Sequence, residues 1–99
     1  VTTYRGDDYY NADGRALEWT STSWPTLTGA TITAVISGVC TLTGSVVSAS
    51  KVRLELTDAQ TTAIPEGDYA FQIYAALVTS GNIVTLVDAF WTSKDRVTV

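Results

Sequence analysis

Histidine and methionine are both absent from the 99 residues of this chain. Without histidine the chain has no Ser-His-Asp triad, and it lacks the commonest general base and zinc-binding side chain. A Ser-Lys dyad is open in principle, but Ser50 and Lys51 are adjacent in an expected strand and would point to opposite faces. Ten acidic residues in a small domain form some close pairs by chance. We therefore expect no enzymatic activity.

Cysteine occurs once, as Cys40, so no disulfide can form within the chain. The residue lies in an apolar stretch, and no neighbouring base or cation is present to lower the pKa of its thiol. We expect Cys40 to be a small, buried or half-buried hydrophobic side chain. A free thiol is compatible with a reducing cytosol.

Charged residues are scarce, at 16% of the chain, and the net charge is −4. This acidic balance argues against nucleic acid as a partner. No apolar run approaches the roughly 18 residues of a membrane span, and no signal-peptide pattern is recognisable, so we expect no membrane partner. No pattern calls for a cofactor. The start at Val1 predicts either loss of an initiator methionine or a segment of a longer protein.

Hydrophobic residues make up 45% of the chain, which is enough for one domain spanning residues 1–99. Apolar and polar residues alternate in short stretches separated by glycine- and proline-containing turns, a pattern typical of a β-sandwich or barrel. The segment 20–28 is irregular and predicts a loop, and Ser80-Gly-Asn82 predicts a hairpin. The alternation predicts strands at 3–5, 8–12, 30–37, 40–47, 52–56, 69–78 and 83–91, and a short last strand at 96–99.

The segment 51–74, KVRLELTDAQTTAIPEGDYAFQIY, is the most informative part of the sequence. It contains two alternating strands, and Thr57 with Gln60 fits a capping box that predicts one helical turn near 57–63. Pro65 then disfavours helical geometry, and Gly67 allows a sharp turn into the next strand. This order resembles the corner between strands E and F of immunoglobulin-like domains. We therefore predict an all-β, immunoglobulin-like sandwich of about seven to eight antiparallel strands, of a branch without the disulfide.

The N-terminal acidic segment suggests two short motifs. Asp7, Asn11 and Asp13 could supply some of the oxygen ligands that calcium needs, but their spacing does not match an EF-hand loop. Asp13-Gly14 is better interpreted as a hairpin turn. Arg5-Gly-Asp7 spells the integrin-binding tripeptide, but it leads directly into an expected strand rather than a loop tip. We expect no metal site and no integrin site.

Four aromatic residues are the candidate binding residues of this chain: Tyr9, Tyr10, Trp19 and Trp24. The two tryptophans fall in a segment that the pattern predicts as loop, so at least one is expected to be exposed. Exposed tryptophan and tyrosine are enriched at protein interfaces. Packing in the core and stacking on a sugar are the two alternative roles. We predict a protein interface at these residues.

Several segments follow one another in a recognisable order: Arg-Gly-Asp-Asp at 5–8, Leu-Thr-Gly-Ala-Thr-Ile-Thr-Ala-Val-Ile at 27–36, the strand at 52–56, Leu-Thr-Asp at 56–58, Ile-Pro-Glu-Gly-Asp-Tyr at 64–69 and Val-Asp-Ala-Phe-Trp at 87–91. This order is similar to that of the immunoglobulin-like N-terminal domain of bacteriophage baseplate upper proteins and of related phage tail and fibre proteins. The chain departs from that family in the Trp-rich segment 19–25 and in the absence of a following receptor-binding region.

The resemblance implies a structural protein of a bacteriophage virion, in the tail, baseplate, fibre or as a capsid decoration. Such a protein is made in the bacterial cytoplasm and incorporated into the virion. Its implied partners are other virion proteins and copies of itself, which the domain contacts without catalysis. The alternative function is a carbohydrate-binding or adhesion module that recognises a cell surface.

Overall fold

The computed structural model describes residues 1–97. It contains strands, one short helix and one 3-10 turn. In chain order these are β1 (Thr2–Tyr4), η1 (Asn11–Asp13), β2 (Leu17–Thr20), β3 (Thr31–Ile36), β4 (Cys40–Thr43), β5 (Ser45–Ser48), β6 (Lys51–Leu54), α1 (Asp58–Ala63), β7 (Gly67–Ala76) and β8 (Ile83–Lys94).

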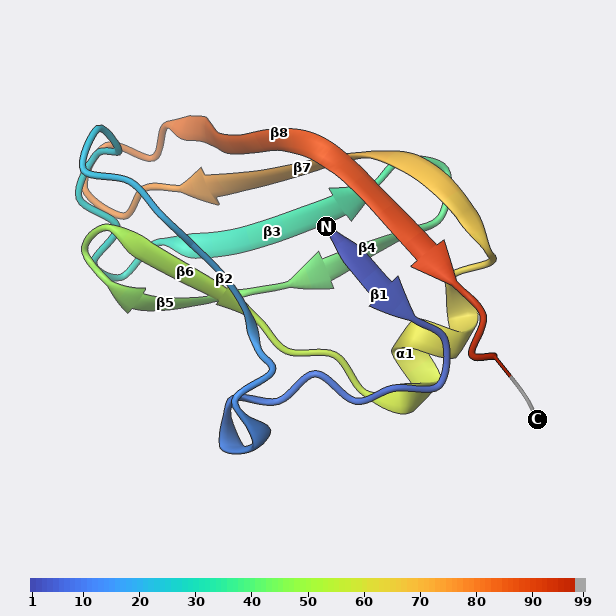
Figure 1. Cartoon of the computed structure of the whole chain (residues 1–99). Helices are drawn as coiled ribbons and strands as arrows, with labels where there is room; N and C mark the ends of the chain where they lie inside the picture. The colour runs from blue at the N-terminus through green and yellow to red at the C-terminus, as the bar shows by residue number, and fades with distance from the viewer. Residues whose placement is uncertain (98–99) are drawn as a thin grey trace.

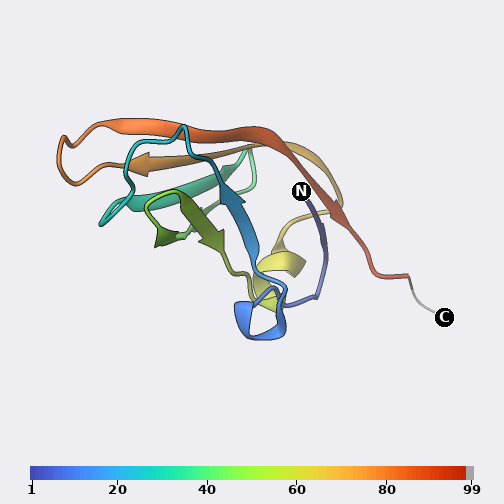
Figure 2. The same ribbon diagram turned by 60° about the vertical axis from the view of Figure 1, so that its left-hand side comes forward.

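The strands form two sheets that pack face to face (Figures 1 and 2). One sheet has the order β1-β8-β7-β3-β4, and the other has the order β2-β6-β5. With β2 as strand B, this is the order of an immunoglobulin-like sandwich, in which B, E and D face G, F, C and C′. The predicted all-β sandwich is confirmed. One detail differs, because β1 pairs with β8 in parallel rather than antiparallel.

The core lies between the two sheets and is centred on aromatic side chains. Phe71 on β7 and Trp91 on β8 are both fully buried, and their rings meet edge to face at 5.1 Å. The indole N–H of Trp91 donates to the buried hydroxyl of Thr3 at 2.9 Å. This bond satisfies the polar atoms that the core would otherwise leave unpaired, and it ties β1 to β8.

The predicted corner between β6 and β7 is confirmed in detail. Thr57 caps α1: its hydroxyl accepts from the backbone N–H of Gln60, and the Gln60 side chain accepts from the backbone N–H of Thr57. The hydroxyl of Tyr69 then donates to the carbonyl of Pro65 at 2.8 Å. A tyrosine near the start of strand F that bonds to the backbone a few residues upstream is typical of immunoglobulin-like domains.

The segment between β1 and β2 differs from its prediction. No strand forms at 8–12, because Tyr9 alone bridges to Leu56 and the chain then turns into η1. Asp13-Gly14 is not a hairpin turn either. Gly14 instead ends η1 with a left-handed φ of 70°. The chain thus passes through η1 and then forms β2 in the smaller sheet. The sequence pattern did not predict β2.

The predicted strand 40–47 is two strands in different sheets. β4 pairs with β3 in the larger sheet, whereas β5 pairs with β6 in the smaller one. Gly44 lies between them, at the point where the chain crosses from one sheet to the other.

The remaining strand predictions hold within a few residues at each end, and the loop before β3 and the β7–β8 hairpin are confirmed. The predicted last strand at 96–99 does not form at 96 and 97, and 98–99 lie outside the described residues.

Candidate functional site

The outer face of the five-stranded sheet, the larger of the two sheets, is open to solvent. Its residues follow from the alternation of side chains along each strand. Because Phe71 and Trp91 point into the core, their neighbours Ala70 and Phe90 point outward, and the two lie directly opposite each other across β7 and β8. Phe90 is 72% exposed, which makes it the most exposed aromatic side chain among the described residues.

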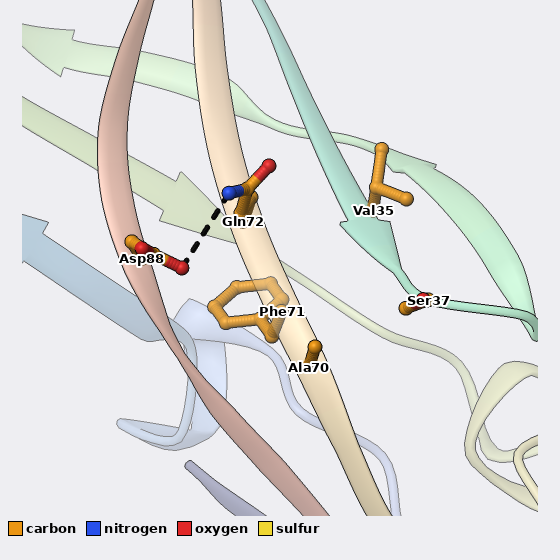
Figure 3. A pocket seen from close by; sticks show the side chains of 6 residues that line it. All are labelled: Val35, Ser37, Ala70, Phe71, Gln72 and Asp88. Atoms are coloured by element: carbon orange, nitrogen blue, oxygen red, sulfur yellow. Dashed lines mark hydrogen bonds between the residues drawn. The ribbon is translucent and has the colours of Figure 1, made fainter.

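A shallow hollow of about 280 Å³ opens on this face. Figure 3 shows the side chains of the residues that line it: Val35, Ser37, Ala70, Phe71, Gln72 and Asp88. They come from β7, its neighbour β8, and β3 with the residue that follows it. The space exists because Ser37 and Ala70 are small while their neighbours on the same face are larger.

The polar groups of the hollow come from a single cross-strand pair. Gln72 and Asp88 lie opposite each other on β7 and β8, and the Gln72 amide lies 3.5 Å from a carboxylate oxygen of Asp88, a long and therefore weak hydrogen bond. Both groups remain available to a second molecule. With Phe90 beside Ala70, the face offers an aromatic ring, an amide and one carboxylate, which suit non-covalent contact with a protein or a sugar.

The opposite face of the sandwich, on the smaller sheet, has a different chemistry. Glu18 on β2 contacts Arg53 at 2.7 Å and Lys51 at 3.2 Å. The hydrogen bond from Arg53, with that from Lys51, lowers the pKa of the Glu18 carboxyl from its ordinary value of 4.5. These charges already satisfy one another, so this face presents fewer free groups to a partner.

The Arg-Gly-Asp tripeptide is folded into the end of the sandwich. Arg5 donates to the carbonyl of Thr62 on α1 and pairs with Asp95 at 2.9 Å. Asp7 pairs with Arg96 at 2.7 Å and with Arg15 at 3.3 Å. Both charged side chains of the tripeptide are therefore engaged within the chain, an arrangement that an integrin would have to disrupt.

The same ion pairs occupy the carboxylate that was considered for calcium. The hydrogen bond from Arg96, with that from Arg15, lowers the pKa of Asp7 from its ordinary value of 3.8. A carboxylate held by two guanidinium groups is a poor cation ligand. Across residues 1–97, no group of three or more acidic or cysteine side chains is placed to hold a metal ion.

Tyr9 and Tyr10, two of the predicted interface residues, lie at the α1 end of the smaller sheet. Tyr9 is buried, its hydroxyl accepts from the backbone N–H of Tyr4 at 2.8 Å, and the guanidinium of Arg15 lies 4.6 Å from its ring centre. Tyr10 is half-buried, and its carbonyl accepts from the backbone N–H of Arg15. Tyr9 therefore serves the core.

Trp19 and Trp24 are both half-buried and pack against the core. Trp19 was expected in a loop, but it lies on β2 with its ring 5.6 Å from that of Phe71. Trp24 lies in the loop before β3. The four predicted residues do not form one exposed surface, because Tyr9 is buried and Trp19 faces inward.

The exposed face around Phe90 was missed by the sequence analysis, although a signal for it was present. The expected strand 83–91 alternates, and in a two-sheet sandwich it points only one member of the pair Phe90-Trp91 into the core. Which of the two faces out is decided by the neighbouring strand, where Phe71 and Ile73 define the inner side.

A second hollow of about 380 Å³ lies at the corner end of the sheet and includes Glu66, Asp68 and Asp95. Its acidic groups already have partners within the chain. Asp68 accepts from the hydroxyl of Thr92 at 2.6 Å, and Glu66 accepts from the backbone N–H of Asp95 at 3.3 Å. We therefore take the face around Phe90 as the candidate site.

The chain was compared with protein-family models and with curated proteins. No protein-family model matches the chain. A search of curated proteins finds no match either.

Within residues 1–97, none of the helical segments has the length and apolar character needed to cross a membrane. Cys40 is half-buried as expected, and burial raises the pKa of its thiol.

Proposed function

We propose that this chain is a structural domain of a bacteriophage virion, placed in the tail, baseplate, fibre or capsid decoration, which docks to other virion proteins and to copies of itself without catalysis. The order of sequence motifs that resembles phage baseplate domains supports this role. The single observation that carries the docking function is the outer face of the larger sheet, where Phe90 is 72% exposed beside an open hollow.

Covering an exposed phenylalanine on a strand removes apolar surface from water and is therefore favourable. A fully buried phenylalanine contributes about 1.5 to 3 kcal/mol relative to an exposed one, so docking over Phe90 has a clear driving force. The adjacent hollow between Ser37, Ala70 and Asp88 can receive one protruding side chain of a partner. In a symmetric particle, each such contact is repeated, so that a weak contact becomes a stable assembly.

Incorporation into particles tests this proposal. Antibodies against the chain should label virions purified from its source, and Phe90→Ser should reduce the amount incorporated about tenfold, a loss of about 1.4 kcal/mol. Val47→Ser is the matched control, because Val47 is an apolar β-strand side chain, 41% exposed, on the smaller sheet. Absence of the chain from purified particles would refute the proposal.

A carbohydrate-binding module is the second candidate, and one observation favours it. Phe90, the amide of Gln72 and the carboxylate of Asp88 lie near one another on an open face, and sugars are bound by aromatic rings combined with such polar groups. Glycan-array binding that is lost in Phe90→Ser and retained in Val47→Ser would support this candidate. Such a result would assign the face around Phe90 to glycan recognition instead of assembly.

A further inference from the structure

Strand β8 has a long open edge. On one side it pairs with β7 from Ile83 to Ser93 apart from the bulge, but on the other side β1 covers only Thr92, Ser93 and Lys94. The N-terminal amine of Val1 adds a bond to the carbonyl of Phe90. Among residues 1–97, no backbone segment other than residues 1–5 hydrogen-bonds to this side of β8. The upper border of the sheet in Figure 1 shows this edge.

The side chains along the edge are also incompletely covered. On β7 the inward residues Phe71 and Ile73 are fully buried, whereas on β8 the inward residues Val84 and Ala89 are only half-buried. Long apolar edges are normally protected by lysine, proline, an inward-pointing charge or a β-bulge. From 83 to 90 the strand holds neither lysine nor proline, and its only charge is that of Asp88, which points outward. The edge does contain a bulge at Leu86, where the register with β7 shifts.

The bulge gives the edge an unusual symmetry. From residue 83 to residue 86 the side chains are exposed, half-buried, exposed and half-buried in turn. From residue 87 to residue 90 they are half-buried, exposed, half-buried and exposed, so the order of exposure is the same in both directions along the strand. The centre lies between Leu86 and Val87. A second copy laid antiparallel about this centre places outward side chains beside outward ones and inward beside inward, a match that a slip of one residue would lose.

From this pattern we propose that two copies of the chain pair antiparallel along β8, about a two-fold axis between Leu86 and Val87. Thr85 of each copy then lies opposite the partner's Asp88, and the two residues exchange their backbone hydrogen bonds. Period-two alternation supports this for Asp88, because the Phe90 carbonyl points to the open edge and Asp88 lies two residues earlier. The bulge at Leu86 then shifts the alternation by one residue, so the backbone groups of Thr85 also point to the open edge. The outer faces of the two copies become one continuous surface.

The side chains of the paired strands complement one another in the same register. Ile83, 69% exposed, meets the partner's Phe90, 72% exposed, at both ends of the contact. The half-buried Val84 meets the partner's Ala89, and the Thr85 hydroxyl can donate to the partner's Asp88. The two Asp88 carboxylates stay apart, because Asp88 lies three positions after Thr85 and each position adds up to about 3.4 Å along the strand.

The proposed contact between the two β8 strands ends where other parts of the chain limit the free edge. Val1 lies against the edge between Phe90 and Thr92, bonded to both, so a partner strand must leave β8 at Phe90. The residue opposite Phe90 is the partner's Ile83, where β8 begins and the chain turns into the hairpin loop. A two-fold contact of this kind closes on itself and gives a dimer rather than a fibre.

A charge exchange at one position tests the register. Thr85→Lys places a cation opposite the partner's Asp88 twice per dimer and should lower the dimer Kd about 2- to 30-fold. Thr85→Asp places a second acid there and should raise the Kd by a similar factor. The measurement is sedimentation equilibrium of the purified chain over a concentration series. Thermal melts of dilute samples confirm that each variant is folded.

Thr41→Lys and Thr41→Asp are the matched controls. Thr41 is an exposed threonine on β4, the strand at the opposite edge of the same sheet, so the controls alter charge and strand propensity equally. Opposite effects at 85 and none at 41 support the pairing. A wild-type chain that stays monomeric up to about 1 mM, a Kd that corresponds to only about 4 kcal/mol, would overturn it, as would equal responses at both positions.

Hydrogen exchange of the wild-type chain supplies an independent readout. The backbone amides of Thr85 and Asp88 should become more protected as concentration rises, whereas those of β4 should not. Dimerisation without added protection at these amides would also overturn the inference. The pairing does not rest on virion function, because incorporation into particles and dimerisation of the isolated chain are measured separately.

Discussion

At the scale of single residues, Asp7 organises one end of the molecule. Its carboxylate joins Arg15, which follows η1, to Arg96, which follows β8. Arg96 also donates to the carbonyl of Gly6 at 2.6 Å. These contacts hold the segment between β1 and β2 against the C-terminal residues. Exposed ion pairs each contribute about 0.2 to 1 kcal/mol, so the value of Asp7 lies in joining two of them.

Neutralising Asp7 should weaken the fold at neutral pH and have little effect in acid. The folded state lowers the pKa of Asp7 below its ordinary value of 3.8, so the stabilisation is fully present above that pH and is lost as the pH falls through the lowered pKa of the folded state. We expect Asp7→Asn to reduce the free energy of unfolding by about 1 kcal/mol at pH 7. Urea unfolding at pH 7 and at a series of pH values extending well below 3.8 measures this.

Asp13→Asn is the control for this prediction, because Asp13 is exposed and makes no ion pair among the described residues. It should change stability little at any pH of the series. If Asp7→Asn lowers stability equally at pH 7 and at the lowest pH of the series, the effect comes from packing rather than from the two ion pairs.

At the scale of elements, Gly44 divides the chain between the two sheets. A Cβ atom added there would lie 2.8 Å from the Cγ2 of Ile32 and 3.1 Å from the carbonyl oxygen of Arg53. The backbone of the crossing therefore passes too close to both sheets for a side chain. Such contacts arise only when both sheets are in place, and this explains why the alternation over 40–47 predicted one uninterrupted strand.

Gly44→Ala should destabilise the sandwich by about 1 to 3 kcal/mol, because the methyl group must displace Ile32 or the β6 backbone. Ser45→Ala, at the exposed neighbouring position, is the control and should cost less than about 0.5 kcal/mol. Chemical denaturation of both variants is the measurement. Equal stability of Gly44→Ala and the wild type would show that the crossing has room for a side chain.

The elements differ in how far local sequence specifies them. α1 was predictable because the Thr57 and Gln60 bonds join residues three apart. β2 was not, because it is only four residues long and its partner β6 lies more than thirty residues further along the chain. Pairing between distant segments leaves no local signature beyond a short alternation, and here Trp19 on β2 looked like part of a loop.

At the scale of the whole molecule, the two ends of the chain are joined. β1 lies beside the last part of β8, and the hydrogen bond from Trp91 to Thr3 spans 88 residues within the core. Because Trp91 also packs on Phe71, this bond connects the N-terminal strand to the centre of the sandwich. Loss of β1 would therefore open the core as well as the edge.

Thr3→Val should lower stability by about 1 to 3 kcal/mol, since valine keeps the shape but leaves the Trp91 N–H unpaired in the core. Thr2→Val is the matched control at the exposed neighbouring position of β1. Thermal and chemical unfolding report the difference, and a red shift of tryptophan fluorescence would report opening around Trp91. Two variants of equal stability would mean that the indole finds another partner.

The sequence by itself determined the class of the fold, the capped turn, the corner at Tyr69 and the β7–β8 hairpin, because these depend on period-two alternation and on contacts between near neighbours. It also excluded histidine chemistry and an internal disulfide. Only the tertiary structure decided that Tyr9 and Trp19 face the core, that Phe90 faces solvent, that Gly44 is a crossing and that β8 has an open edge. Each of these depends on which distant strand lies alongside, and side-chain alternation defines two faces without saying which one the rest of the chain will cover.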